Sequence, residues 1–400
     1  MSGRPAYRSA TISDLHLRAG RGDDFKFDRQ FSALIDALLA DGCRELVLNG
    51  DVFEFVATWP ETQDHPDPGL GYTEAESTAR LVAIAMEHPE VFEAMRRFCV
   101  DGGRLVVLPG NHDWELHWPQ VRQQLSEIVG SPGPDKLQFV LNGRPYRPVP
   151  GLHIEHGHQL IDDQNIFHHP DSPLMDDPLG GPRRIEQSVG NWLVRCLVNP
   201  VERHFPFVNN VRPFMKIEWL DGGHGVRLMA ALIEGTWGAF HDQRIPTRVL
   251  NLILSTPPFL RLLGPVKTPL NFMRPEHVMP NLAHALNDDS TSSLRAAARR
   301  HLQVFGQTRY VIMGHSHEYI DQTHEVNRFF ARHGRAYLNP GSWNPCLTVP
   351  QEAQALSIDE LTRGYDFPYR IDFVLSQGDN RADLEVRLET FETGKVRLAA

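Results

Sequence analysis

The sequence predicts a mixed α/β protein. Short apolar runs rich in Val, Leu and Ile, each closed by polar or glycine residues, are typical of buried strands, here at 7–13, 45–49 and 104–108. Between these runs, apolar residues recur at helical spacing, which predicts helices over 27–39, 74–86 and 89–100. Strands that alternate with helices imply an α/β sheet.

The composition is that of an ordinary globular protein, with 400 residues, 41% hydrophobic and 22% charged. A formal net charge of -10 and a pI near 6.0 argue against a general polyanion-binding surface, so no long nucleic acid is expected as a partner. The four cysteines are scattered, and we expect them to be reduced.

No segment predicts secretion or membrane spanning. The first residues lack the apolar core of a signal peptide, which predicts a cytoplasmic protein. The most apolar stretch, 249–266, is interrupted by Pro257, Pro258 and Arg261. Peripheral contact with the inner face of a membrane stays open.

The strand pattern returns near the C-terminal end after a long interruption. Further strands are predicted around 137–141 and 151–156, and then at 310–313, 336–339, 369–375 and 383–391. The segment between, Pro-rich and apolar, is therefore predicted to be an insertion. This gives a core of 1–158 and 309–400 with an insertion at 159–308.

Polar motifs follow three of the predicted strands in turn: SDLHL, NGDVFE and PGNHDWE. Open α/β sheets bind ligands beyond the carboxyl ends of their strands, so these motifs are expected to share a site. Asp14 and His16, one residue apart, could face the same ligand if the segment is extended. Asp51 could bridge two cations through its two oxygens, and Asn111 offers an amide oxygen.

Three more histidines end later strands: His156 in EHGHQ, and His315 and His317 in GHSH. A single histidine is more often structural than a ligand, and a bare Gly-Asp is usually a turn. Their conjunction indicates a metal centre, because every candidate follows an apolar strand. Oxygen and nitrogen ligands without cysteine suit manganese, iron, zinc or cobalt better than calcium. Two carboxylates leave two divalent ions positively charged, which favours an anionic substrate such as a phosphate ester.

The ordered motifs SDLHL, GDVFE, GNHD, HGH and GHSH resemble the calcineurin-like metallophosphoesterase superfamily over 7–158 and 309–392. The resemblance implies a four-layer α-β-β-α sandwich, here with a largely helical insertion, and two divalent ions, manganese first. One ion would be bound by Asp14, His16, Asp51 and His317. The other would be bound by Asp51, Asn111, His156 and His315.

The chemistry that this resemblance implies is hydrolysis of a phosphoester. Water or hydroxide between the ions would attack phosphorus in line, and His112 would contact the phosphate and protonate the leaving oxygen. His158 competes with His156 as a ligand, and His156 is preferred because the family's ligand precedes a glycine. Asp113 would orient His112 or cap the following helix. Asn339, Ser342 and Trp343 are left outside the predicted site.

Within the superfamily, SDLHL, GDVFE and HGHQL are similar to the UDP-2,3-diacylglucosamine diphosphatase branch. Two features depart from that branch: it has an arginine where His112 stands, and its insertion is shorter. The insertion here mixes aromatic and aliphatic residues with arginines. It is expected to be a lid for an acyl chain, a membrane-surface helix, or a subdomain with its own core or a homodimer interface.

Several functions fit this sequence. The first is hydrolysis of a nucleotide-diphosphate or lipid-linked substrate. The alternatives are a general phosphomonoesterase, or a phosphodiesterase for small nucleotides, and a non-catalytic scaffold that binds protein through the insertion. The complete set of ligands argues against the scaffold.

Overall fold

A computed structural model of the chain describes residues 7–58, 65, 67, 69–130, 133, 135–161, 164–202, 205–212, 290–322, 334–348 and 357–397. Their contacts divide the chain into two units. The first consists of Met1–Ser188, Ser290–Asn344 and Tyr369–Gly394, and the second of Val189–Asp289, Pro345–Pro368 and Lys395–Ala400. The predicted mixed α/β class, with several sheets, is confirmed.

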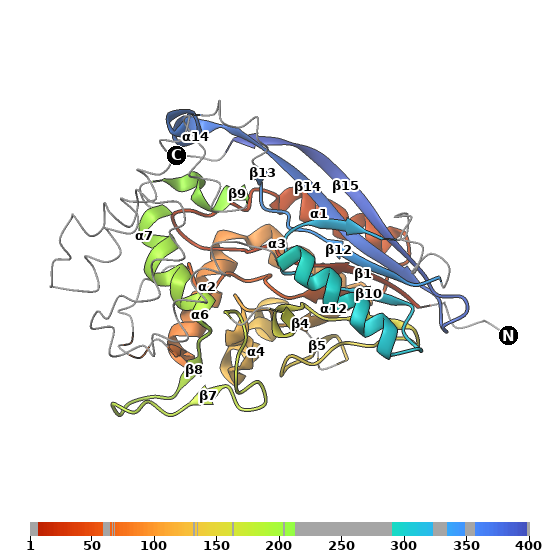
Figure 1. Cartoon of the computed structure of the whole chain (residues 1–400), viewed down its shortest axis with the longest axis horizontal. Coiled ribbons are helices and arrows are strands. Elements are labelled where there is room, and N and C mark those ends of the chain that lie inside the picture. Colours follow the sequence, from red (N-terminus) through yellow and green to blue (C-terminus); the bar gives the residue numbers. More distant parts are fainter. Residues whose placement is uncertain are drawn as a thin grey trace. The chain divides into compact units, whose positions relative to one another are not determined.

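The larger sheet has the strand order β15-β14-β1-β2-β4-β5 (Figure 1). Its strands are β1 (Arg8–Ile12), β2 (Glu45–Asn49), β4 (Arg104–Leu108), β5 (Leu137–Phe139), β14 (Asp366–Gln377) and β15 (Glu385–Arg397). The strands from β1 to β5 in this order are parallel, and β14 pairs with β1 antiparallel. The carboxyl ends of β1, β2 and β4 therefore lie at one edge, where the first three polar motifs begin.

Helices connect the parallel strands as predicted: α1 (Asp28–Ala40), α2 (Glu74–Glu87), α3 (Pro89–Val100), η1 (Trp114–His117) and α4 (Pro119–Ile128). Thr73 begins α2 with a capping box, in which its hydroxyl accepts from Glu76 N and the Glu76 carboxylate accepts from Thr73 N. Pro89 occupies the first turn of α3, where its missing N–H costs nothing.

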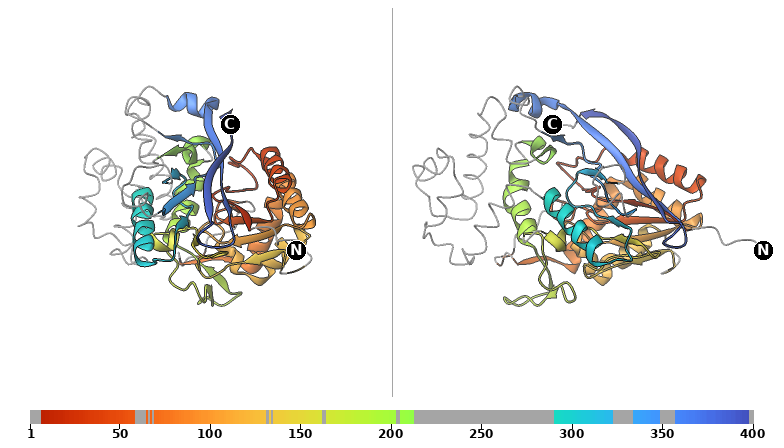
Figure 2. Two further views of the ribbon diagram at one scale, coloured as in Figure 1. Left: turned by 90° about the vertical axis from the view of Figure 1, so that its right-hand side faces the viewer. Right: turned by 45° about the vertical axis from the view of Figure 1, so that its right-hand side comes forward.

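A second sheet, of order β11-β12-β10-β6, packs against the first. It contains β6 (Leu152–Ile154), β10 (Tyr310–Ile312), β11 (Tyr319–Asp321) and β12 (Ala336–Pro340). Val47 and Val106 of the larger sheet share one buried core with Ile154 and Ile312 of the second. Helix α12 (Ser290–Val304) packs on the other face of the second sheet through Leu294, Ala298 and Leu302 (Figure 2).

A third, small sheet joins β3 (Leu70–Thr73) to two strands from inside the predicted insertion, β8 (Arg184–Glu186) and β7 (Leu174–Met175). The insertion therefore also contains strands. Most of 159–308, including the apolar stretch 249–266, lies outside the described residues, so its proposed boundaries and helical character stay predictions.

The second unit contains short elements. They are α6 (Val189–Leu193), a π-helical turn (Val194–Val198), α7 (Asn199–Glu202), η3 (Pro206–Asn210), β9 (Val211–Arg212), β13 (Leu347–Thr348) and α14 (Ile358–Gly364). Strand β9 pairs with β13, and Ser357 caps α14 with a capping box. Among the described residues, no helix is long and apolar enough to cross a membrane.

A buried histidine between α2 and α3 predicts a pH-dependent stability. The His88 side chain lies 3.1 Å from Asp28 Oδ1 and 2.9 Å from Arg18 O, and its Nε2 lies 3.5 Å from Asp23 Oδ1. Burial alone would lower its pKa, but the two aspartates raise the pKa of His88 to about 9. The stabilisation is therefore complete below an unfolded pKa of about 6.5 and is lost as pH rises through 9.

We expect His88→Gln to lower the free energy of unfolding by about 3 kcal/mol at pH 6, and by much less at pH 10. Denaturant titrations of both proteins across this range measure the difference. A difference that stays constant with pH would contradict a protonated His88 in the folded protein.

Candidate metal centre

The predicted ligands come from loops at the ends of strands in both packed sheets. Those after β1, β2 and β4 carry Asp14, His16, Asp51 and Asn111, and those after β6 and β10 carry His156, His315 and His317. All of them belong to the first unit.

Five of these residues have left-handed backbone conformations. Their φ angles are 54° for Asp14, 49° for His16, 52° for Asp51, 67° for His315 and 58° for His317. The expectation that Asp14 and His16 converge by extended alternation is therefore wrong. Non-glycine residues rarely adopt this conformation, and where they do the surrounding structure must hold it.

Hydrogen bonds between the loops provide that support. Asp14 N donates to Gly50 O at 3.1 Å, and His16 N donates to Asp51 O at 2.9 Å. These two hydrogen bonds hold the loop after β1 against the loop after β2. His315 N lies 3.0 Å and 3.1 Å from the two Asp14 carboxylate oxygens. The Ser342 hydroxyl donates to Asp14 O at 2.7 Å, so this residue supports the site although it was left outside the prediction.

The first group of candidate ligands contains Asp14, His16, Asp51 and His317, with one donor atom of each within 4.8 Å of the others. His16 Nε2 lies 3.1 Å from His317 Nε2, and His317 Nε2 lies 3.4 Å from Asp14 Oδ1. Asp14, His16 and Asp51 are buried, and His317 is half-buried.

The second group contains Asp51, His156 and His315, again with donor atoms within 4.8 Å. His156 Nδ1 lies 2.9 Å from Asn49 O and donates its proton there, so the ring nitrogen available to a metal is Nε2, which lies 3.2 Å from Asp51 Oδ2. Asp51 belongs to both groups, as a bridging carboxylate would.

Asn111 lies next to this second group because of Gly110. A Cβ at Gly110 would lie 2.2 Å from Asp51 Oδ1 and 2.8 Å from His156 Nε2, so this loop approaches both side chains closely. Asn111 itself is buried, and its Nδ2 donates to Asn165 Oδ1 at 3.3 Å.

Gly110→Ala tests whether this close approach shapes the centre. The added methyl group would displace Asp51 or His156, and we expect the affinity for divalent ions to fall about 10- to 100-fold. Equilibrium dialysis with Mn²⁺ measures the loss. Gly306→Ala is the matched control, because the nearest atom to its added Cβ lies 3.9 Å away. Unchanged Mn²⁺ binding in Gly110→Ala would contradict this geometry.

Glu54, which the sequence prediction missed, holds two histidines of the site. Its Oε2 lies 2.9 Å from His16 Nδ1 and 2.6 Å from His112 Nδ1, and its Oε1 accepts from Ala57 N at 3.0 Å. Burial alone would raise the pKa of Glu54, but the imidazoles of His112 and His16 lower it below the usual range. The only signal in the sequence was the position of Glu54 at the end of GDVFE.

Glu54 also sets the charge of His112. Burial would lower the pKa of His112, but the carboxylates of Glu54 and Asp51 raise it to about 9. The backbone N–H of His112 donates to Asp51 Oδ1 at 2.8 Å, which fixes the loop beside the two groups. His112 is thus a protonated group next to the candidate ligands at neutral pH, able to give up a proton.

Asp113 has neither of the two roles predicted for it. It makes no side-chain cap on η1, and its carboxylate instead accepts from the backbone N–H groups of Val52, Phe53 and Gly110. It therefore joins the loop after β2 to the loop after β4. Burial raises the pKa of this carboxyl to about 6.

His158 lies beside the second group and outside it. Its ring centroid is 5.4 Å from that of His156 and 6.3 Å from that of His315, and it packs against Trp114 and Phe167. The structure thus directs His156, and not His158, at Asp51. Asn339 donates to Gly314 O and Trp343 donates to Asp372 O, so both support the structure from outside the ligand groups.

Comparison with known proteins gives distant structural similarity. Neither a family model nor a curated protein matches the chain. A solved dimetal phosphatase from Danio rerio is similar with a TM-score of 0.31 and 10% identity, covering 97% of this chain and 100% of that one. A second solved structure is similar with a TM-score of 0.29 and 11% identity, over 97% and 100% of the two chains.

Proposed function

We propose that this chain is a dinuclear metal-dependent phosphoester hydrolase of the calcineurin-like metallophosphoesterase type. The observation that carries the proposal is that two groups of buried or half-buried nitrogen and oxygen donors share one carboxylate, Asp51. The ordered motifs and the two packed sheets with outer helices agree with the four-layer sandwich of that superfamily.

The donor set fits two divalent transition ions. It contains aspartate oxygens and imidazole nitrogens and no cysteine, which suits manganese, iron, zinc or cobalt. Asp14, His16, Asp51 and His317 would hold one ion, and Asp51, Asn111, His156 and His315 the other. When bound, these ions would supply an acidified solvent nucleophile and positive charge for the phosphoryl oxygens.

The surrounding residues would prepare the site for this chemistry. Glu54 fixes the His16 ring through Nδ1, which leaves Nε2 as the donor for a metal. The same carboxylate keeps His112 protonated, so that it can give its proton to the leaving oxygen. Asp113 and Ser342 hold the loops that carry these groups.

We infer that the substrate is a phosphorylated small molecule or a lipid-linked phosphoester, and a nucleotide-diphosphate or lipid-linked substrate is the first candidate. The support is the likeness of SDLHL, GDVFE and HGHQL to the UDP-2,3-diacylglucosamine diphosphatase branch, together with the apolar insertion. General phosphomonoesters and small-nucleotide diesters are the alternatives.

A substrate panel with the Mn²⁺-reconstituted protein tests the function. It contains a simple aryl monoester, a bis-aryl diester, a nucleotide sugar diphosphate and its diacylated form. Preference for the diacylated form, measured as release of the nucleotide monophosphate, supports the lipid-linked substrate. Preference for the simple esters overturns that substrate and keeps the hydrolase. No turnover with any metal overturns the enzyme and favours a protein-binding scaffold.

A further inference from the structure

A further group of candidate metal ligands shares no residue with the groups that contain Asp51. It consists of His153, Glu155 and His301, with one donor atom of each within 4.8 Å of the others. Ile154, between the first two, packs into the core shared by the two sheets. Because side chains alternate along a strand, His153 and Glu155 face the opposite side, where α12 lies. His301 comes from the last turn of that helix.

These three side chains are tightly packed. His153 Nε2 lies 2.5 Å from Glu155 Oε1, and the ring centroids of His153 and His301 are 3.8 Å apart. His153 and Glu155 are buried. Two imidazoles and one carboxylate form a common donor set for zinc.

We propose that His153, Glu155 and His301 form a separate mononuclear site for a divalent transition ion of the zinc class. The site joins β6 to α12, the helix that follows the residues 213–289, which lie outside the described part of the chain. It is independent of the proposed hydrolytic function, since none of its three residues belongs to the two groups that share Asp51.

Arg147 competes with an ion at this site. Its Nε donates to His153 Nδ1 at 3.2 Å, so a neutral His153 carries its proton on Nε2, where it donates to Glu155. An ion bound at Nε2 would move that proton to Nδ1, where it would face the Arg147 N–H. The ion and the Arg147 hydrogen bond therefore exclude each other.

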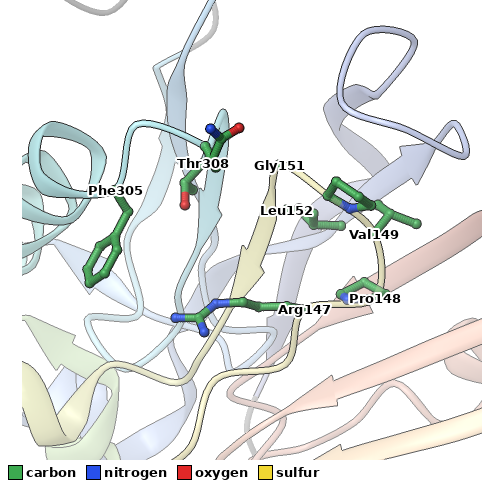
Figure 3. A pocket seen from close by; sticks show the side chains of 9 residues that line it. Arg147, Pro148, Val149, Gly151, Leu152, Phe305 and Thr308 are labelled. Atoms are coloured by element: carbon green, nitrogen blue, oxygen red, sulfur yellow. The ribbon is translucent and has the colours of Figure 1, made fainter.

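Arg147 has room to turn away. It lines a cavity of about 440 Å³ together with Pro148, Val149 and Phe305, and its guanidinium extends into this space (Figure 3). The displaced guanidinium could thus remain solvated when an ion binds.

The test is the number of Zn²⁺ ions bound by the full chain after equilibrium dialysis, measured by mass spectrometry. We expect three ions for the wild type and two for His301→Phe, which keeps a flat ring beside His153 but no donor nitrogen. Asp51→Asn should keep this third ion even where it loses the other two, which separates the two sites. His169→Phe, at an exposed histidine, should still bind three.

Arg147→Met should have the opposite effect on Zn²⁺ binding to His301→Phe. Removal of the competing donor should tighten the third Zn²⁺ about tenfold, the equivalent of one charge-assisted hydrogen bond. In the Asp51→Asn background, which lacks the shared centre, Co²⁺ at the third site should give a d–d absorption band that is lost when His301→Phe is added and is stronger at limiting metal when Arg147→Met is added. Equal Zn²⁺ stoichiometry in the wild type and His301→Phe overturns the site. If His301→Phe fails to fold, unchanged Zn²⁺ affinity in Arg147→Met overturns it alone.

Discussion

Asp51→Asn should abolish turnover and remove the two metal ions of the shared centre. The Asp51 carboxylate belongs to both groups of candidate ligands, and its Oδ1 also accepts the backbone N–H of His112. An amide has one acceptor oxygen in place of two and no charge, so it cannot bridge two cations. We expect the rate of phosphoester hydrolysis to fall by at least about 10³-fold, equivalent to about 4 kcal/mol of transition-state stabilisation. Metal analysis and initial rates with Mn²⁺ measure both effects.

A buried aspartate away from the site controls for damage to the fold. Asp372 is buried, and its carboxylate accepts from Arg370 and Thr390. Asp372→Asn should therefore lower stability while the metal content and the rate per folded molecule stay at wild-type values. Full activity in Asp51→Asn would overturn the shared-carboxylate centre and with it the proposed hydrolase.

The strands that carry the site were predictable because buried strands have a recognisable sequence pattern. Strands 45–49 and 104–108 are observed with the predicted bounds, since each is an apolar run ended by polar or glycine residues. The polar motifs that follow them meet at one sheet edge because the strands are parallel. This inference needs only that the strands are parallel, and the alternation of strands with helices along the sequence already indicates that.

The local conformation of the site was not predictable in this way. The sequence SDLHL does not indicate that Asp14 and His16 have positive φ, because non-glycine residues usually avoid the left-handed region. Hydrogen bonds to the loop after β2 hold these two residues in that conformation. Glu54 was missed for a related reason. A glutamate after an apolar residue resembles a surface residue, and only the pairing of Leu17 with Phe53 brings it beside His16.

Asp113 shows that a rule based on neighbouring residues in the sequence can predict the wrong hydrogen-bond partners. An aspartate before a helix predicts an N-cap, but here three backbone N–H groups of two loops are left without strand partners and bind the carboxylate instead. Each buried donor without an acceptor costs about 1 to 3 kcal/mol, so three of them together outweigh a cap worth about 1 kcal/mol.

Glu54→Gln should separate metal binding from proton transfer. A glutamine keeps the size of the side chain and can still accept from one imidazole, so we expect both metals to stay bound. The loss of charge removes the main cause of the raised pKa of His112, which then falls from about 9 toward its usual value. His112 must be protonated to serve as the acid, so activity is lost as pH rises through that pKa.

The alkaline limb of the pH–rate profile should therefore move to lower pH in Glu54→Gln, with a fall in kcat of about 10- to 100-fold near neutral pH. His112→Ala should lose turnover at every pH while it keeps its metals, because no group is left to titrate. Glu45→Gln is the matched control, since Glu45 is a buried glutamate at the other end of β2 that binds Arg104 and Tyr146. Glu54 Oε2 lies 2.6 Å from His112 Nδ1, so removing the charge of Glu54 must change the pKa of His112. If the alkaline limb of Glu54→Gln does not move, a group other than His112 supplies the proton.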